Sequence, residues 1–321
     1  MLYKLKDLSF QLLFTLLALY LTFLLLCYPV PALEYASRGL SLWFEKMIPT
    51  LLPFMILSGI MIRMNLTERF AKFFHPLFHK IWGTSLNGSY VILMGMLCGF
   101  PMGARVIGEL CAARKLSEEE GAYLLAFCNN IGPIYFLSFV MGTLSLSGNY
   151  VPFLIMYGVP LGYGVLLRLF LSVSSAAKHT PVRAMPMQAA ESFMPYAKTP
   201  SLLRAIDDSV LSGLIGIAKL GGYMVFFNLL NIMLFPFSSL PEGFSSFCNC
   251  MLEITSGISR AGARHGLMVL IMLPFGGLSC ISQTYSMIKE TNLSILQYFL
   301  HKCIQTAITM LLYFLLLRSF L

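Results

Sequence analysis

Two charged side chains stand inside long apolar runs, where a charge is energetically costly. Arg105 ends the stretch MLCGFPMGAR, and Glu253 lies in the stretch LEITSGI. Ionisable residues within membrane-length segments are rare and mark substrate or ion pathways, so both are candidates for binding or proton transfer. Glu253 is expected to carry a proton or to pair with Arg260 or Arg264. The alternative for Arg105 is a side chain that reaches out to the membrane interface.

Both charges lie next to positions where a helix is expected to break. Glycine tolerates backbone conformations closed to other residues, and proline lacks the amide hydrogen that a helix needs. Irregular backbone at membrane depth is tolerated only where it is buried in protein or lines a cavity, so we expect the breaks to meet at one substrate site. Besides Arg105 and Glu253, the candidate substrate-binding residues are Gly99, Phe100, Pro101 and Gly103; Asn129, Asn130 and Gly132; Thr255, Ser256 and Gly257; and Gly276, Gly277 and Ser279.

The same residue types also have purely structural explanations, which the sequence alone leaves open. Glycines such as Gly103 permit close contact between helices. The asparagines before Pro133 can instead satisfy the backbone amides that the proline frees, and Ser279 can hydrogen-bond to a neighbouring helix. His265 and His301 are lone histidines near membrane boundaries and are expected to be interfacial.

The composition indicates an all-α polytopic membrane protein as the framework for these residues. Of 321 residues, 57% are hydrophobic and 11% are charged, and the mean hydropathy is +0.77. A soluble globule could not cover so much apolar surface. The eight cysteines have neither a disulfide framework nor zinc-site spacing, so no metal site is expected. The net charge of +8 suits loops and membrane lipid rather than nucleic acid.

Runs of about 20 apolar residues predict the membrane spans. The predicted spans are 8–27, 47–62, 122–144, 151–173, 209–235, 267–288 and 295–317, and two interrupted stretches, 88–113 and 244–266, are interpreted as re-entrant hairpins. The corresponding domains are an N-terminal transmembrane anchor at 1–39, a first repeat at 40–145, a connecting helix and cytoplasmic loop at 146–208, and a second repeat at 209–321.

The distribution of basic residues supports this topology. With a retained N-terminal anchor starting inside, the basic segment 63–80 and the polar loop 174–208 fall on the cytoplasmic side, and the C-terminus falls outside. The two halves then contain the same order of elements but enter the membrane from opposite sides. Such inverted repeats with broken helices are typical of alternating-access transporters.

At these residues a family resemblance is evident. The segment 99–140, which begins GFPMGARVIGEL and contains FCNNIGPIYF, resembles the nucleoside-recognition or Gate domain family, and LEITSGI with the overall layout is similar to sporulation integral membrane proteins of the YlbJ type. The resemblance implies a fold related to concentrative nucleoside transporters, and a sporulation role in which dipicolinic acid crosses the outer forespore membrane. Phe100, Pro101 and Met102 stand where nucleoside transporters of that fold carry a polar, carboxylate-bearing tip, which counts against nucleoside binding and sodium coupling.

The sequence therefore predicts a membrane transporter of a small anionic metabolite. Arg105, Arg260 and Arg264 outnumber the acids near the breaks, and arginine suits planar carboxylates such as dipicolinate. The alternatives are a non-transporting scaffold or spore-assembly factor, and a nucleoside transporter. No catalytic motif is present, so we expect no enzyme activity and no cofactor. The coupling ion, the direction of transport and homo-oligomer formation stay open.

Overall fold

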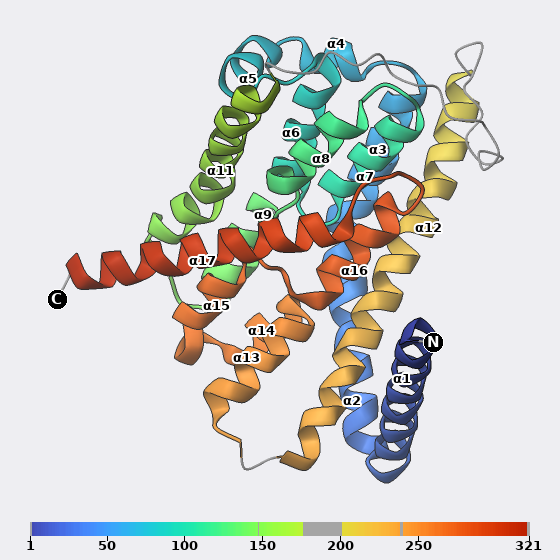
Figure 1. Ribbon diagram of the computed structural model, residues 1–321, viewed down its shortest axis with the longest axis vertical. Helices are drawn as coiled ribbons and strands as arrows, with labels where there is room; N and C mark the ends of the chain where they lie inside the picture. Colours follow the sequence, from blue (N-terminus) through green and yellow to red (C-terminus); the bar gives the residue numbers. More distant parts are fainter. Residues whose placement is uncertain (1, 147, 176–200, 238–239, 320–321) are drawn as a thin grey trace.

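The computed structural model describes residues 2–146, 148–175, 201–237 and 240–319, and within these ranges the secondary structure is entirely helical (Figure 1). Six helical stretches in these ranges are long and apolar enough to cross a bilayer: Pro29–Arg63, Glu118–Thr143, Val151–Phe170, Leu202–Phe237, Ala263–Ile288 and Ile295–Leu316. The chain is therefore an all-α multi-pass membrane protein, as the composition predicts.

The N-terminal region differs from the predicted spans. Helix α1 (Leu2–Cys27) contains the predicted span 8–27, but its stretch Gln11–Cys27 is a shorter apolar helix than the six above. The predicted span 47–62 is only the second half of a continuous 35-residue stretch, Pro29–Arg63. At 1.5 Å per residue this stretch is about 52 Å long, well beyond the hydrocarbon thickness of about 30 Å.

This long stretch is built from α2 (Pro29–Leu42), the π-helical turn η1 (Trp43–Met47) and α3 (Ile48–Arg63). It packs lengthwise against α12 (Leu202–Leu229), which continues through the 3-10 helix η3 (Leu230–Phe237). Trp43 strengthens this contact because its Nε1 donates to the carbonyl of Ile217 at 2.8 Å.

The other long helices agree well with the remaining predicted spans, and shorter helices lie between them. In the first half they are α4 (Thr67–Ala71), α5 (His75–Trp82), α6 (Leu86–Cys98), α7 (Met102–Ala112), α8 (Glu118–Cys128), α9 (Pro133–Tyr135), η2 (Phe136–Val140), α10 (Met141–Thr143) and α11 (Val151–Ser175). In the second half they are α13 (Glu242–Leu252), α14 (Ile254–Ala261), η4 (Ala263–His265), α15 (Gly266–Met272), α16 (Gly277–Ile288) and α17 (Ile295–Ser319). Most of the predicted loop 174–208, namely 176–200, lies outside the described residues.

Both predicted hairpin segments are helical hairpins in the structure. Helices α6 and α7 pack against each other, and so do α13 and α14. Figure 1 shows the first pair in the upper part of the molecule and the second pair in the lower part. Each half has the same order: a long helix (α3 or α12), a hairpin, a broken helix, and an apolar helix (α11 or α17). That the halves are inverted across the bilayer, with re-entrant hairpins, stays a prediction.

Local sequence explains where these helices start. Ser85 caps α6 by accepting from the amide of Gly88, and Ser117 caps α8 by accepting from the amide of Glu120. The acids Glu118 and Glu119 in the first turn of α8 complement the positive end of the helix dipole. These caps fix the ends of α6 and α8 that lie away from the breaks.

Candidate substrate site

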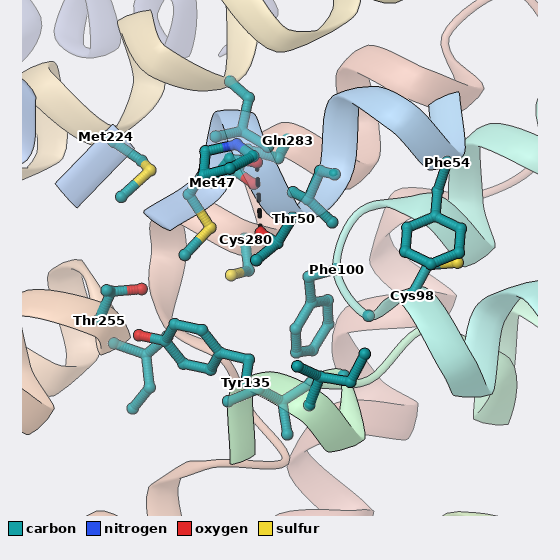
Figure 2. Close-up of a pocket in the computed structure, with 18 of the residues that line it drawn as sticks. Met47, Thr50, Phe54, Cys98, Phe100, Tyr135, Met224, Thr255, Cys280 and Gln283 are labelled. Atoms are coloured by element: carbon teal, nitrogen blue, oxygen red, sulfur yellow. Dashed lines mark hydrogen bonds between the residues drawn. The ribbon is translucent and has the colours of Figure 1, made fainter. Parts of the chain in front are cut away.

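One cavity of about 270 Å³ lies where the helix breaks of both halves come together. Its wall includes residues from the turn of the first hairpin, from the break after α8, from the break before α14, and from the start of α16. These residues are Cys98, Gly99 and Phe100; Ile131, Gly132 and Tyr135; Glu253, Ile254 and Thr255; and Cys280 and Gln283. Helices α3 and α12 close the cavity with side chains such as Thr50, Phe54 and Met224 (Figure 2).

Glycines allow the breaks to approach one another. Gly99 has a φ of +87°, and a Cβ built on it would stand 2.4 Å from the backbone nitrogen of Gly132. In the second half, Gly277 has a φ of +81°, and its Cβ would stand 2.9 Å from the carbonyl oxygen of Cys250. Any side chain at Gly99 or Gly277 would therefore separate a hairpin from its partner break.

Phe100 connects the two halves. A Cβ on Gly276, which has a φ of +76°, would stand 3.0 Å from Cζ of the Phe100 ring. The tip of the first hairpin thus packs on the break of the second half. Figure 2 shows the rings of Phe100 and Tyr135 directed into the cavity.

Glu253 lines the cavity but is held by the start of α14. The side chain is 1% exposed. Its Oε1 accepts from the amide of Thr255 at 3.1 Å and its Oε2 from the amide of Ser256 at 2.8 Å, while Asn228 donates to Oε2 at 3.4 Å. Glu253 is therefore the N-cap of a helix, where a carboxylate is stabilised by the amides and by the helix dipole.

The predicted partners of Glu253 are wrong. Arg260 donates to Asn249 Oδ1 at 3.1 Å and stacks over the ring of Tyr35, and Arg264 pairs with Glu242 at the surface. Arg260 lies about two turns from the N-terminal end of α14, and Arg264 lies beyond the end of that helix and the positive-φ residue Gly262. Neither side chain lines the cavity.

Arg105 is buried but turned away from the cavity. It is 4% exposed, and its Nε donates to Glu109 Oε1 at 2.8 Å. Its Nη2 donates to Ser212 Oγ at 2.9 Å, so the guanidinium joins α7 to α12. Because Pro101 is the N-cap of α7, Arg105 stands one turn into the helix, and helical geometry directs it to α12 instead of the tip. The arginines therefore give no charge to the cavity wall.

Most of the other predicted residues lie behind the cavity wall and contact neighbouring helices. Asn129 accepts from the amide of Ala104 and donates to Thr284 Oγ1 at 2.9 Å and to Tyr298 Oη at 3.0 Å. Ser279 is buried and accepts from Gln283 at 2.9 Å. Pro101, Gly103, Arg105, Asn129, Asn130, Ser256, Gly257, Gly276, Gly277 and Ser279 do not line the cavity, whereas Gly99, Phe100, Gly132, Glu253 and Thr255 do.

Gly103 is a packing residue and not part of the turn. It lies in the first turn of α7, and its Cβ would stand 2.4 Å from the carbonyl oxygen of Cys128. Gly95 of α6 faces the same oxygen, at 2.0 Å. The hairpin and α8 therefore meet at backbone distance, which is the close-contact explanation that the sequence left open.

The sequence of this chain is similar to one family model and to one curated protein. Residues 44–147 match the Gate family model, described as nucleoside recognition. The chain is also 24% identical, over an alignment of 320 residues, to the sporulation integral membrane protein YlbJ of Bacillus subtilis (strain 168). That alignment covers 89% of this chain and 78% of YlbJ. No solved structure matches the chain.

The Gate segment, residues 44–147, supplies the first hairpin and the first broken helix, and α3 within it also lines the cavity. Sequence reasoning missed the contribution of α3, including Thr50 and Phe54. Pro53 marks this helix in the sequence, but the helix continues through the proline without a break. Sequence reasoning also missed Tyr135, whose hydroxyl has no hydrogen-bond partner among the described residues.

Lys302 is the most informative residue that sequence reasoning missed. It lies in α17 and is 0% exposed. A lysine inside an apolar span is an intramembrane charge, so the argument that singled out Glu253 also applies to it. Lys302 lies in the last helix, far from any glycine or proline, so no helix break marks it.

Proposed function

We propose that this chain is a transporter of a small organic metabolite and that the cavity is its binding site. The observation that carries the proposal is that the breaks of both halves line one cavity. Irregular backbone at membrane depth requires such a reason, and transporters place their substrate sites at the interface of two repeats. The proposed mechanism is alternating access, in which the halves move around this site, and it involves no catalysis.

The cavity favours a small, flat substrate that has an apolar ring face. Its volume of about 270 Å³ is below the range of about 300–1,000 Å³ typical of drug-sized ligands. Phe100 and Tyr135 offer aromatic faces to a planar ring. Thr50, Gln283 and the unpartnered hydroxyl of Tyr135 offer polar contacts that would fix its orientation.

Dipicolinic acid is the candidate substrate that we propose first, with the outer forespore membrane as the location. Dipicolinic acid is a planar ring with two carboxyl groups. The relative YlbJ is named as a sporulation integral membrane protein. A nucleoside is the second candidate, because the matching family model is described as nucleoside recognition. A scaffold without transport is the remaining alternative.

The test is uptake by proteoliposomes that contain the purified protein. Labelled dipicolinate, uridine and adenosine are supplied separately, with empty liposomes as the background. We expect uptake of dipicolinate, and we expect Thr50→Trp to abolish it because the indole fills the cavity. Leu57→Trp is the matched control, since Leu57 lies on the same helix, is 51% exposed and does not line the cavity.

The possible results separate the functions. Uptake of a nucleoside alone would keep the transporter and replace the substrate. No uptake of any compound by a folded protein would favour the scaffold. Equal loss of uptake in Thr50→Trp and Leu57→Trp would show that the cavity is not the site.

A further inference from the structure

Lys302 places a buried ammonium group directly behind the cavity wall. Its Nζ donates to Asn130 Oδ1 at 2.7 Å, and it lies 5.2 Å from the ring centroid of Phe100 and 5.6 Å from that of Tyr298. Among the described residues, no carboxylate forms an ion pair with it. The group therefore has one amide oxygen and two aromatic faces as its surroundings.

These surroundings do not account for a charge. An ammonium has three donors, and among the described residues Lys302 Nζ donates only one hydrogen bond. A neutral donor could also hold Asn130 Oδ1 in place, so this hydrogen bond does not by itself require a positive charge. A buried charge is strongly disfavoured unless it is paired, so an anion from outside the described residues would stabilise the charged form of Lys302.

The same face of α17 is polar along its length. Gln305 and Thr309 are buried below Lys302, and Gln305 Oε1 and Thr309 Oγ1 have no hydrogen-bond partner among the described residues. Spacings of three and four residues place these side chains on one stripe of the helix. The interior face of α17 therefore has unused polar atoms about one and two turns along the helix from Lys302.

Phe100 stands between this group and the cavity. It belongs to the cavity wall and its ring also lies over Lys302. The Phe100 ring packs on Gly276. Because Gly276 has no side chain, it does not hold the ring in place. Glu253, the charged residue of the cavity wall, already has both oxygens bonded to backbone amides, so its charge is compensated where it stands.

We propose that Lys302 is the cation that pairs with an anionic substrate, once the Phe100 ring turns away from its place between the ammonium and the cavity. This inference rests on the proposed function, since it assigns a substrate class to the same site. Lys302 takes the place of the arginines as the source of positive charge. Like them it is not part of the cavity lining, but its Nζ lies over the ring of Phe100, which is part of that lining.

The test measures binding and transport separately. Dipicolinate binding to the purified protein is measured by calorimetry, beside the uncharged analogue pyridine-2,6-dicarboxamide. We expect Lys302→Met to weaken dipicolinate binding about 10- to 100-fold, the range for loss of one charge-assisted hydrogen bond, and to leave binding of the diamide unchanged. Lys219→Met is the matched control, because Lys219 is exposed on α12.

A second variant guards against a folding defect in Lys302→Met. Asn130→Asp keeps the lysine but supplies an internal carboxylate next to its ammonium, so dipicolinate should again bind more weakly. Equal dipicolinate affinity in the wild type and in a folded Lys302→Met or Asn130→Asp protein would overturn the inference. So would equal weakening of the diamide by Lys302→Met.

The two proposals fail in different ways. If the wild type binds dipicolinate through Lys302 but liposomes take up nothing, the anion site stands and the transport function is wrong. If the wild type transports a nucleoside and does not bind dipicolinate, transport stands and the anion site is wrong.

Discussion

Arg105 donates from Nη2 to the hydroxyl of Ser212 at 2.9 Å, and this bond joins the first hairpin to the long helix α12. The same guanidinium donates from Nε to Glu109. Its planar fork thus spans two partners that a single ammonium cannot reach in the same geometry. Since α12 belongs to the second half, Arg105 is a contact between the halves and not a ligand of the cavity.

We therefore expect Arg105→Lys to lower stability and to leave ligand affinity unchanged. The loss should be about 1–3 kcal/mol, because a buried charge loses part of its hydrogen bonding. The measurement is the thermal midpoint in detergent together with dipicolinate affinity. Arg264→Lys is the control, since Arg264 forms an exposed pair that contributes little. A normal midpoint with weakened binding would instead place Arg105 in the substrate site.

Glu253→Gln should destabilise the protein as well as impair transport. A glutamine retains one oxygen but turns an N–H toward the amide of Thr255 or Ser256, so one cap bond is lost. Loss of an N-cap costs about 0.5–2 kcal/mol. Thermal midpoint and uptake are measured together, with Glu242→Gln as the exposed control. A variant that keeps its stability but loses all transport would support the proton carrier that the sequence suggested.

Gly95→Ala and Gly103→Ala should both be strongly destabilising. Each new Cβ would meet the carbonyl oxygen of Cys128, at 2.0 Å and 2.4 Å, and backbone atoms cannot move aside cheaply. Forced overpacking costs about 1–3 kcal/mol. Gly158→Ala in α11 is the control, because nothing lies within 4 Å of its Cβ, so it should be neutral or slightly stabilising. Similar midpoints for all three variants would contradict this helix packing.

Asn129→Ala should weaken the contact between the two halves of the molecule and leave ligand binding unchanged. The substitution removes the acceptor for Ala104 N and the donor to Thr284 and Tyr298. Leaving buried groups unsatisfied costs about 1–3 kcal/mol each, so the midpoint should fall. Gln297→Ala on the exposed face of α17 is the control. An unchanged midpoint with loss of dipicolinate binding would instead show that Asn129 is a substrate-binding residue.

Much of the fold follows from local sequence, because length and hydropathy determine spans such as 151–173 and because glycine and proline mark the breaks at 99–101 and 132–133. The continuity of α2 with α3 does not follow. The charged residues Glu45 and Lys46 in η1 interrupt the apolar run, so the predicted span starts only at residue 47, although the helix passes through them. Tertiary packing against α12 overrides that local signal.

The candidate site is predictable only where a break marks it. Gly99, Gly132 and Glu253 are found because their own segments are irregular. The direction in which a regular helix presents a side chain depends on its neighbours, which explains both the misplaced Arg105 and the overlooked Lys302. Pairing between α7 and α12, or between α8 and α17, is a long-range property that no single segment encodes.

The cavity wall contains one thiol from each half, Cys98 from α6 and Cys280 from α16. Both side chains are more than nine-tenths covered, whereas Cys27 and Cys303 are exposed. The wild-type chain therefore carries its own chemical reporters. The partly exposed Cys111 and Cys248 must be removed together with Cys27 and Cys303. In that protein, a membrane-impermeant maleimide added on one side reaches Cys98 and Cys280 when the cavity opens to that side, so the labelling rate would follow the opening of the molecule.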